Sequence, residues 1–346
     1  MEYAQACNFS RFPSWCVIAY NRKVTRKTFI HHDGALGDVL LSLACLRAVR
    51  ESSDFVHLAG PPAVTEVLKE TGFVHETSPA GNTLFTSLYT REIERGTVDF
   101  LQQFDHAVLF TRQRESLLAI NLTKVISDIN IIVTIPPHGV GSHVAEFRLS
   151  QLARAATSDA TPLGINIPLR CREEGRKLLV RFFGNEGWER LIAFHPGSGG
   201  KRKCWPLVNY FELAERLHRL HTCRILFLTG PSEEPEVADY VQDFADRHAG
   251  MAHIRNQPLI TVACLLAESR LYVGNDSGVT HLAASVNAEV IAIFGPTAPT
   301  LWKPLGTRVH VISGGISEHS LAELSVEQVH ERLIPILQER SKRSAQ

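Results

Sequence analysis

The stretch LYVGNDSGVTHLAASV, residues 271–286, decides the fold class, because it runs from a short apolar strand through a polar glycine turn into a helix. We expect the strand over Leu271–Val273 and the helix over Ser277–Val286. Short β-branched or aromatic runs alternate with longer amphipathic segments in the same way along most of the chain. This alternation is typical of repeated βα units with a parallel sheet, so the sequence predicts an α/β protein.

The units form two series of similar size. Strands expected in the first series are Thr28–His32, Phe55–Ala59, His106–Phe110 and Ile131–Ile135. Those expected in the second are Leu191–His195, Arg224–Leu228, Leu271–Val273, Val290–Phe294 and Val309–Ile312. Long helices are expected from Leu36 to Arg50, from Val208 to His221 and from Glu234 to Arg247. Two doubly wound, Rossmann-like halves would face each other across a cleft at the carboxyl ends of their strands, where such proteins bind ligands.

The expected domain boundaries follow these two series. They are a basic N-terminal extension at residues 1–27, a first Rossmann-like domain at 28–161, a linker at 162–170, a second Rossmann-like domain at 171–324, and a C-terminal helix and tail at 325–346. The last helix is expected over 326–338 and could pack on either half. The extension is interpreted either as a flexible arm or as a contact with an anionic lipid surface.

The composition is that of an ordinary globular protein. The 346 residues include 36 Lys+Arg and 36 Asp+Glu, so the formal net charge is zero and a general nucleic-acid binder is excluded. The seven cysteines are scattered and include no C-x-x-C pair, which indicates reduced thiols and a cytoplasmic location. No apolar run approaches the roughly 18 residues of a membrane helix, so the protein is expected to be neither exported nor membrane-spanning.

The segment HHDGALGDV, residues 31–39, passes from a strand through a glycine turn into a helix. Gly34 and Gly37 permit a tight turn and a close approach of a ligand to the backbone. Asp38 would lie in the first turn of the helix and face the cleft. It is either a chemical group of the site or a helix cap that complements the dipole. The segment lacks the patterns of a dinucleotide fingerprint and of a P-loop.

The segment HPGSGGKRKCWP, residues 195–206, combines three glycines, a serine and three consecutive cations. Exposed amides, the Ser198 hydroxyl and the cations at 201–203 suit phosphate oxygens, so we expect an anion site here. Trp205 is expected to anchor the loop.

The turn within residues 273–284 could likewise hold a pyrophosphate, with Asp276 or Ser277 as the helix cap and His281 one turn further on. The alternative is an ordinary helix start with an interior histidine. The acidic residues of the segment GPSEE, residues 230–234, could accept bonds from ribose hydroxyls or cap a helix.

Three segments together resemble the ADP-heptose:lipopolysaccharide heptosyltransferases of glycosyltransferase family 9. They are GDVL at 37–40, HPGS with K-x-WP at 195–206, and GNDSGVTHLAA at 274–284 followed by FGPT at 294–297. The similarity extends over residues 28–340. It implies the GT-B architecture of two Rossmann-like domains, and inverting transfer of heptose from ADP-heptose to the lipopolysaccharide inner core without a metal or another cofactor.

The same resemblance implies roles for individual residues. Asp38 would be the general base that takes the proton of the acceptor hydroxyl, and Lys203 the cation on the donor phosphate. The donor site would further comprise Gly197, Ser198 and Gly199 beside that phosphate, Asp276, Ser277, Gly278, Val279 and His281 around the diphosphate and sugar, and Glu233 or Glu234 at the ribose. The sequence departs from the family at Cys204, at Lys201 and Arg202, and in residues 1–27.

The acceptor is expected to be of the lipid A–Kdo type or a core oligosaccharide, reached at the cytoplasmic face of the inner membrane by peripheral contact. Arg112 and Arg114 follow a strand of the first series and are the candidates for binding an anionic acceptor. Alternative functions are a transferase for another nucleotide sugar or for a protein acceptor, a non-catalytic nucleotide-sugar-binding paralogue, and a sugar-nucleotide epimerase.

Overall fold

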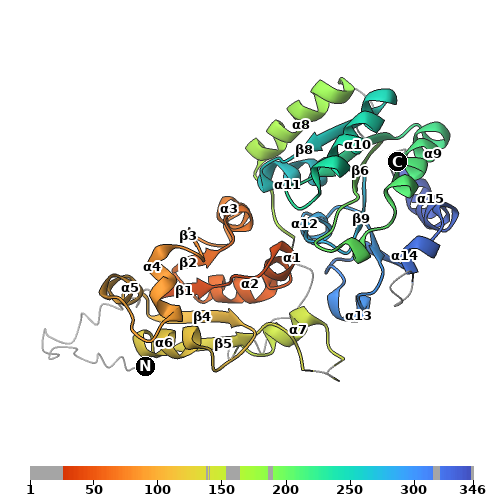
Figure 1. Ribbon diagram of the computed structural model, residues 1–346. Coiled ribbons are helices and arrows are strands. Elements are labelled where there is room, and N and C mark those ends of the chain that lie inside the picture. Colours follow the sequence, from red (N-terminus) through yellow and green to blue (C-terminus); the bar gives the residue numbers. More distant parts are fainter. Residues whose placement is uncertain are drawn as a thin grey trace, which may run out of the picture.

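The computed structural model describes residues 26–137, 139, 141–152, 164–185, 190–314 and 320–343. They form two lobes, drawn from red to yellow and from green to blue in Figure 1. Each lobe is a parallel sheet with helices packed on both faces. The α/β fold of two Rossmann-like lobes is therefore confirmed.

The first lobe has a five-stranded sheet in the order β3-β2-β1-β4-β5. Its strands are β1 (Lys27–His31), β2 (Phe55–Gly60), β3 (Glu76–Pro79), β4 (His106–Thr111) and β5 (Ile129–Val133). Its helices are α1 (Leu36–Leu40), α2 (Leu43–Glu51), α3 (Pro62–Glu70), α4 (Thr83–Thr86), α5 (Arg95–Leu101), α6 (Leu117–Val125) and α7 (Val144–Leu149), with a 3₁₀ turn at Ser87–Tyr89.

The second lobe has a six-stranded sheet in the order β11-β10-β9-β6-β7-β8. Its strands are β6 (Leu191–His195), β7 (Arg224–Thr229), β8 (Met251–Arg255), β9 (Leu271–Asn275), β10 (Val290–Phe294) and β11 (Val309–Ser313). Its helices are α8 (Leu169–Phe183), α9 (Leu207–His221), α10 (Pro235–Arg247), α11 (Leu259–Glu268), α12 (Gly278–Ser285), α13 (Pro299–Trp302), α14 (Ser320–Glu323) and α15 (Val326–Arg343), with a 3₁₀ turn at Lys201–Lys203.

Both strand orders contain a point at which the winding of the chain reverses. It lies between β1 and β4 in the first sheet and between β6 and β9 in the second. The loops that leave adjacent strands there diverge to opposite faces of the sheet and leave a crevice at the carboxyl ends. The two crevices face each other, which places four loops around one space.

The helix expected from Leu36 to Arg50 is interrupted at Leu41 and Ser42. The Ser42 amide donates to the carbonyl of Val39, three residues back, instead of that of Asp38. The Asp38 carbonyl accepts instead from the Ser42 hydroxyl and from Arg148. These polar contacts, which the apolar periodicity of the segment does not reveal, split the helix into α1 and α2.

Several other boundaries differ from expectation. Strand β5 begins two residues early and ends at Val133, because the next carbonyl, of Thr134, accepts from Arg148 instead of continuing the strand. The edge strands β3 and β8 were not expected, since their sequences ETSP and MAHIR lack an apolar run. Helix α8 was also not expected, and it begins inside the predicted linker, after Pro168.

Parts of the predicted extension and linker lie outside the described residues. Residues 1–25 of the predicted extension, and residues 162 and 163 of the predicted linker, are not described. Arg26 and Lys27 belong to the fold rather than to an arm: Arg26 pairs with Asp128 at 3.0 Å and Lys27 opens β1. Helix α15 packs on the second lobe through Val326, Val329, Leu333 and Leu337.

The two lobes touch where α1 meets α12. A Cβ on Gly278 would lie 2.8 Å from the Cβ and Cγ of Leu36, and a Cβ on Gly37 would lie 3.3 Å from Cδ2 of His281. Glycine at both positions therefore lets the two helices approach closely. A continuous cluster of buried side chains joins the lobes, from Ile30 in the first to Leu282 in the second.

Gly278→Ala should lower the free energy of unfolding by about 1–2 kcal/mol. Overpacking costs about 1–3 kcal/mol, which outweighs the gain of up to about 1 kcal/mol when alanine replaces glycine in a helix. Denaturant unfolding followed by circular dichroism measures the difference. Gly200→Ala is the matched control, since a Cβ there meets no atom within 4 Å. Equal stability of the two variants would contradict the close approach of α1 and α12.

Candidate active site

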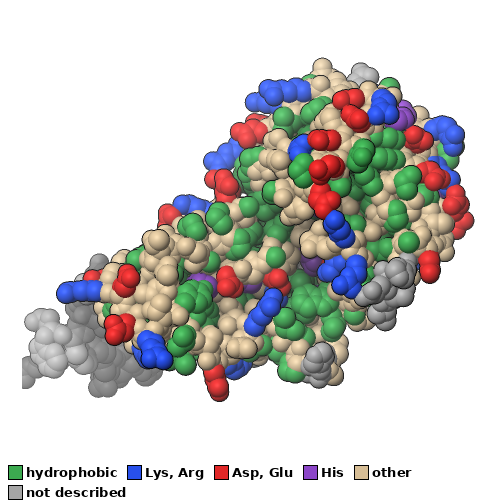
Figure 2. All heavy atoms as spheres, in the orientation of Figure 1, with side chains coloured by type: hydrophobic (Ala, Val, Ile, Leu, Met, Phe, Trp, Pro, Cys, Tyr) green, Lys and Arg blue, Asp and Glu red, His purple; other side chains and the backbone are tan. Residues whose placement is uncertain are grey.

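A pocket of about 1410 Å³ lies between the lobes and is lined by all four loops at the two switch points. Figure 2 shows the hollow between the lobes, with acidic, basic and histidine side chains gathered in it. The first lobe contributes residues of the loops that follow β1 and β4. The second lobe contributes residues of the loops that follow β6 and β9, and Pro296, Thr297 and Trp302 beyond β10.

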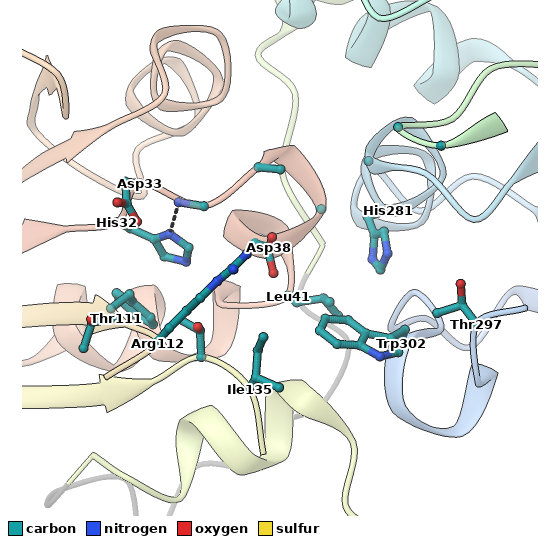
Figure 3. A pocket seen from close by; sticks show the side chains of 18 of the residues that line it. His32, Asp33, Asp38, Leu41, Thr111, Arg112, Ile135, His281, Thr297 and Trp302 are labelled. Carbon is teal, nitrogen blue, oxygen red and sulfur yellow. Dashed lines mark hydrogen bonds between the residues drawn. The ribbon is translucent and has the colours of Figure 1, made fainter. Parts of the chain in front are cut away.

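Asp38 lies in the first turn of α1 and lines this pocket, as the sequence indicated. Its side chain is 37% exposed and belongs to the first lobe (Figure 3). A Cβ on Gly34 would lie 2.8 Å from the Cβ of Asp38, so glycine there leaves room for the carboxylate. The carboxylate does not cap its own helix, because the N-cap of α1 is Ala35 and no side chain bonds the first amides.

Arg148 of α7 holds this carboxylate and is itself fully buried. Its Nη2 donates to Oδ1 of Asp38 at 2.9 Å, and its Nε donates to the carbonyl of Thr134 at 2.9 Å. Its Nη1 donates to the Asp38 carbonyl and to Oγ of Ser42, the latter at 3.0 Å. Sequence reasoning missed Arg148, since it lies 110 positions from Asp38 in a segment with no motif.

His32 completes the network beneath Asp38. Its ring stacks on Phe110 with centroids 4.3 Å apart, and burial lowers its pKa well below the ordinary value, so the imidazole is neutral. Its Nδ1 accepts from the Gly34 amide at 3.2 Å (dashed in Figure 3), so the proton is on Nε2, which donates to Oγ of Ser42. Ser42 thus accepts from His32 and Arg148 and donates to the Asp38 carbonyl.

The loop after β6 brings Ser198 and Lys203 to the opposite wall of the pocket. The Lys203 ammonium lies 2.7 Å from Oδ2 of Asp276, and the Ser198 hydroxyl donates to the Asp276 carbonyl at 2.6 Å. Lys201 is not in the pocket; it pairs with Glu234 at the surface. Glu234, one of the two acidic residues expected at the ribose, is therefore engaged by Lys201.

Asn275, a fully buried residue at the end of β9, ties the loops after β6 and β9 together. Its Nδ2 donates to the carbonyl of Pro196 at 2.7 Å, and its Oδ1 accepts from the Trp205 amide and from the Tyr210 hydroxyl, both at 3.0 Å. Trp205 is buried and its indole donates to the Leu324 carbonyl, which confirms that it anchors the loop. Sequence analysis included Asn275 in a motif but gave it no role.

The turn after β9 begins α12 as expected, with Ser277 as the cap whose hydroxyl accepts from the Thr280 amide. His281 lines the pocket on this helix, and burial lowers its pKa to about 4, so that its imidazole is neutral at pH 7. Gly278 also lines the pocket, whereas the pocket lining does not include Val279.

Glu233 lies beneath the loop after β6, where a Cβ on Gly197 would overlap its carboxylate. Its Oε2 accepts from the Gly230 amide, and burial raises its pKa. Its Oε1 is buried and has no hydrogen-bond partner among the described residues; Nε2 of His195 lies 3.6 Å from it. Burial lowers the pKa of His195 to about 4, so this contact joins a carboxylate to a neutral ring.

Of the two arginines expected to bind the acceptor, only Arg112 lines the pocket. Arg112 is exposed and lines the pocket, where its side chain extends toward Asp38 in Figure 3. Arg114 donates instead to Oε1 of Gln151 at 2.8 Å.

Within the described part of the chain, no group of three or more His, Cys, Asp or Glu side chains could hold a metal ion. No described helix combines the length and apolar character needed to cross a membrane.

Comparison with known proteins agrees with this architecture. A family model described as glycosyltransferase family 9 (heptosyltransferase) matches residues 142–331, more than half of the chain. Lipopolysaccharide heptosyltransferase 2 of Salmonella typhimurium is 28% identical over 182 residues, which cover 50% of this chain and 50% of that protein. Lipooligosaccharide heptosyltransferase 2 of Haemophilus ducreyi is 31% identical over 159 residues, covering 43% and 45%. The matches therefore span half or less of the length of these relatives.

A solved structure extends the likeness to the whole fold. The ADP-heptose lipopolysaccharide heptosyltransferase II of Escherichia coli superposes with a TM-score of 0.72 at 18% identity, covering 91% of this chain and 99% of that one. At this identity the likeness concerns the fold, which is the two-lobed GT-B architecture.

Asn275→Ala should lower the free energy of unfolding by about 2–4 kcal/mol, because it leaves the buried Trp205 amide and Tyr210 hydroxyl without their acceptor. Urea unfolding measures the loss. Tyr210→Phe is the matched control: it removes one of the same bonds and should cost about 1 kcal/mol. If Asn275→Ala cost no more than Tyr210→Phe, Asn275 would not tie the loops together.

Proposed function

Because the chain belongs to glycosyltransferase family 9, we propose that it transfers heptose from ADP-heptose to an acceptor of the lipopolysaccharide inner core, with inversion at the anomeric carbon. One observation carries the proposal: a carboxylate of the first lobe and a lysine beside a helix start of the second lobe line the same pocket. Inverting transfer requires a base on one side of the anomeric carbon and charge stabilisation on the other.

In the proposed reaction Asp38 accepts the proton of the acceptor hydroxyl. The acceptor oxygen forms a bond to the anomeric carbon while the bond from that carbon to the diphosphate breaks, and ADP leaves with the electron pair. Oδ1 of Asp38 is taken by Arg148, so we assign the proton to Oδ2, for which no hydrogen bond is found among the described residues.

The donor lobe supplies the leaving-group side in this proposal. Lys203 neutralises the departing diphosphate, assisted by the Ser198 hydroxyl, by the amides at Gly197–Gly199 and by those that open α12. Asp276 and His281 face the sugar in this proposal, and Glu233 or Glu234 contacts the ribose of the nucleotide. No metal or other cofactor enters the proposed step.

The proposed acceptor is attached to a lipid. We therefore propose that the protein works at the cytoplasmic face of the inner membrane by peripheral contact, and that Arg112 binds an anionic group of the acceptor.

Asp38→Asn should lower kcat by about 100- to 10,000-fold, the usual contribution of a general base, with little change in ADP binding. ADP release from ADP-heptose in the presence of a lipid A–Kdo acceptor measures transfer, and calorimetry measures ADP affinity. Asp33→Asn is the control, since this exposed carboxylate lines the same pocket outside the Arg148 network.

Three outcomes would count against parts of the proposal. Normal turnover by Asp38→Asn would exclude Asp38 as the base. Release from UDP- or GDP-sugars in preference to ADP-heptose would exclude the donor. ADP binding with no release for any acceptor would favour the non-catalytic paralogue.

Removal of metal ions with EDTA should leave the transfer rate unchanged, because Lys203 and the backbone amides carry the leaving charge. Lys203→Met should lower kcat by about 100- to 1,000-fold, the cost of losing one such stabilising group. Rates measured with and without chelator test both statements. A rate that fell with EDTA and returned with Mg²⁺ would mean that a metal ion carries that charge.

A further inference from the structure

Helix α7, six residues long, touches the second lobe at its beginning. His143 is its N-cap: Nδ1 accepts from the Ala145 amide at 3.2 Å, so the ring proton is on Nε2. Nε2 lies 2.9 Å from the carbonyl of Lys303 in the second lobe and therefore donates to it. Burial lowers the pKa of His143, which keeps the ring in this neutral form at pH 7. One imidazole thus both starts the helix and bridges the lobes.

The side chains next to His143 reinforce this contact. Val144 and Ala145 form a small buried cluster with Leu41, and Trp302 and Leu305 of the second lobe pack against it. Trp302 also lines the pocket and lies near Leu41 in Figure 3. The start of α7 is therefore fixed by residues of the second lobe at the edge of the pocket.

The other end of α7 carries Arg148, whose guanidinium is fully buried and holds both the carboxylate and the carbonyl of Asp38. Between His143 and Arg148 lie four residues of continuous helix. A shift of the second lobe at Lys303 or Trp302 would accordingly move Arg148 along with the start of the helix. Between these two side chains the connection is the backbone of the helix.

We propose that α7 is a positioning element that couples the second lobe to the base: the hydrogen bond from His143 to Lys303 sets the orientation of Asp38 through Arg148. This inference rests on the proposed role of Asp38. His143 and Arg148 are positioning residues, since they act through Asp38 and neither of them lines the pocket. The Asp38 carboxylate then has its working orientation only while the second lobe is seated against α7.

His143→Asn separates the two roles of the imidazole. Asparagine is a good N-cap and can still accept from the Ala145 amide, but it is too short to reach the Lys303 carbonyl. We expect kcat to fall about 10-fold with the KM for ADP-heptose unchanged, because small misplacements of a catalytic group are costly. Arg148→Lys keeps the charge but loses the planar fork of donors, and should lower kcat further.

A double-mutant cycle tests whether the effect passes through Asp38. In the Asp38→Asn background, His143→Asn should leave the residual rate unchanged. An equal 10-fold loss in both backgrounds, or no loss in either, would overturn the proposal. High activity of Asp38→Asn alone would instead refute the proposed base, so the two failures are distinguishable.

Thermal unfolding and ADP binding of each variant show whether it is folded. Asn82→Ala is the matched control, because it removes the N-cap of α4 in the same lobe, away from the pocket, and should lower stability without lowering kcat. If Arg148→Lys did not fold, His143→Asn and its cycle would still decide the proposal. A fall in kcat for Asn82→Ala as large as that for His143→Asn would mean that general loosening of the lobe explains both, and would also overturn it.

Discussion

The buried guanidinium of Arg148 is the constraint on which the architecture of the first lobe depends. A charged group removed from water destabilises the folded state by several kcal/mol unless each of its donors is satisfied. Arg148 finds acceptors in the carbonyls of Thr134 and Asp38, the Ser42 hydroxyl and the Asp38 carboxylate. To supply them, strand β5 ends early and the first helix breaks after Leu40. The local irregularities around Asp38 are therefore consequences of one side chain.

In the second lobe a neutral side chain, the amide of Asn275, holds an irregular loop in place. The loop after β6 carries three glycines and would be poorly ordered by itself. The side-chain amide of Asn275 fixes it by bonding Pro196 and Trp205. An amide can donate and accept at once, which suits a position between a carbonyl and an N–H group. The loop can thus present its own amides and Lys203 to the pocket, because its anchoring bonds are made on the buried side.

The repeated βα units, and the loops that carry the site, could be predicted from the sequence because buried parallel strands read as apolar runs and glycine marks tight turns. Asp38, Ser198, Lys203 and His281 were found in this way, and all four line the pocket. Edge strands such as Glu76–Pro79 were not, since a strand paired on one side needs little apolar sequence. Arg148 and His143 were missed for a different reason: each acts on a residue more than 100 positions away, and local sequence holds no record of such a partner. The sequence suggested site roles for Glu234 and Arg114, but in the structure each of these exposed side chains pairs with another residue: Glu234 with Lys201 and Arg114 with Gln151.

The ion pair between Lys203 and Asp276 has a consequence for inhibitor design. With its ammonium already 2.7 Å from a largely buried carboxylate, Lys203 is not a vacant cation waiting for an anion. If Lys203 binds the donor diphosphate as proposed above, a compound that offers only a diphosphate competes with Asp276 and gains little net attraction. A compound that also carries a hydroxyl or ammonium group beside its diphosphate can donate a hydrogen bond to Asp276 and replace the contact with Lys203 that this carboxylate loses. Inhibitors with both groups should therefore bind more tightly than simple phosphate analogues.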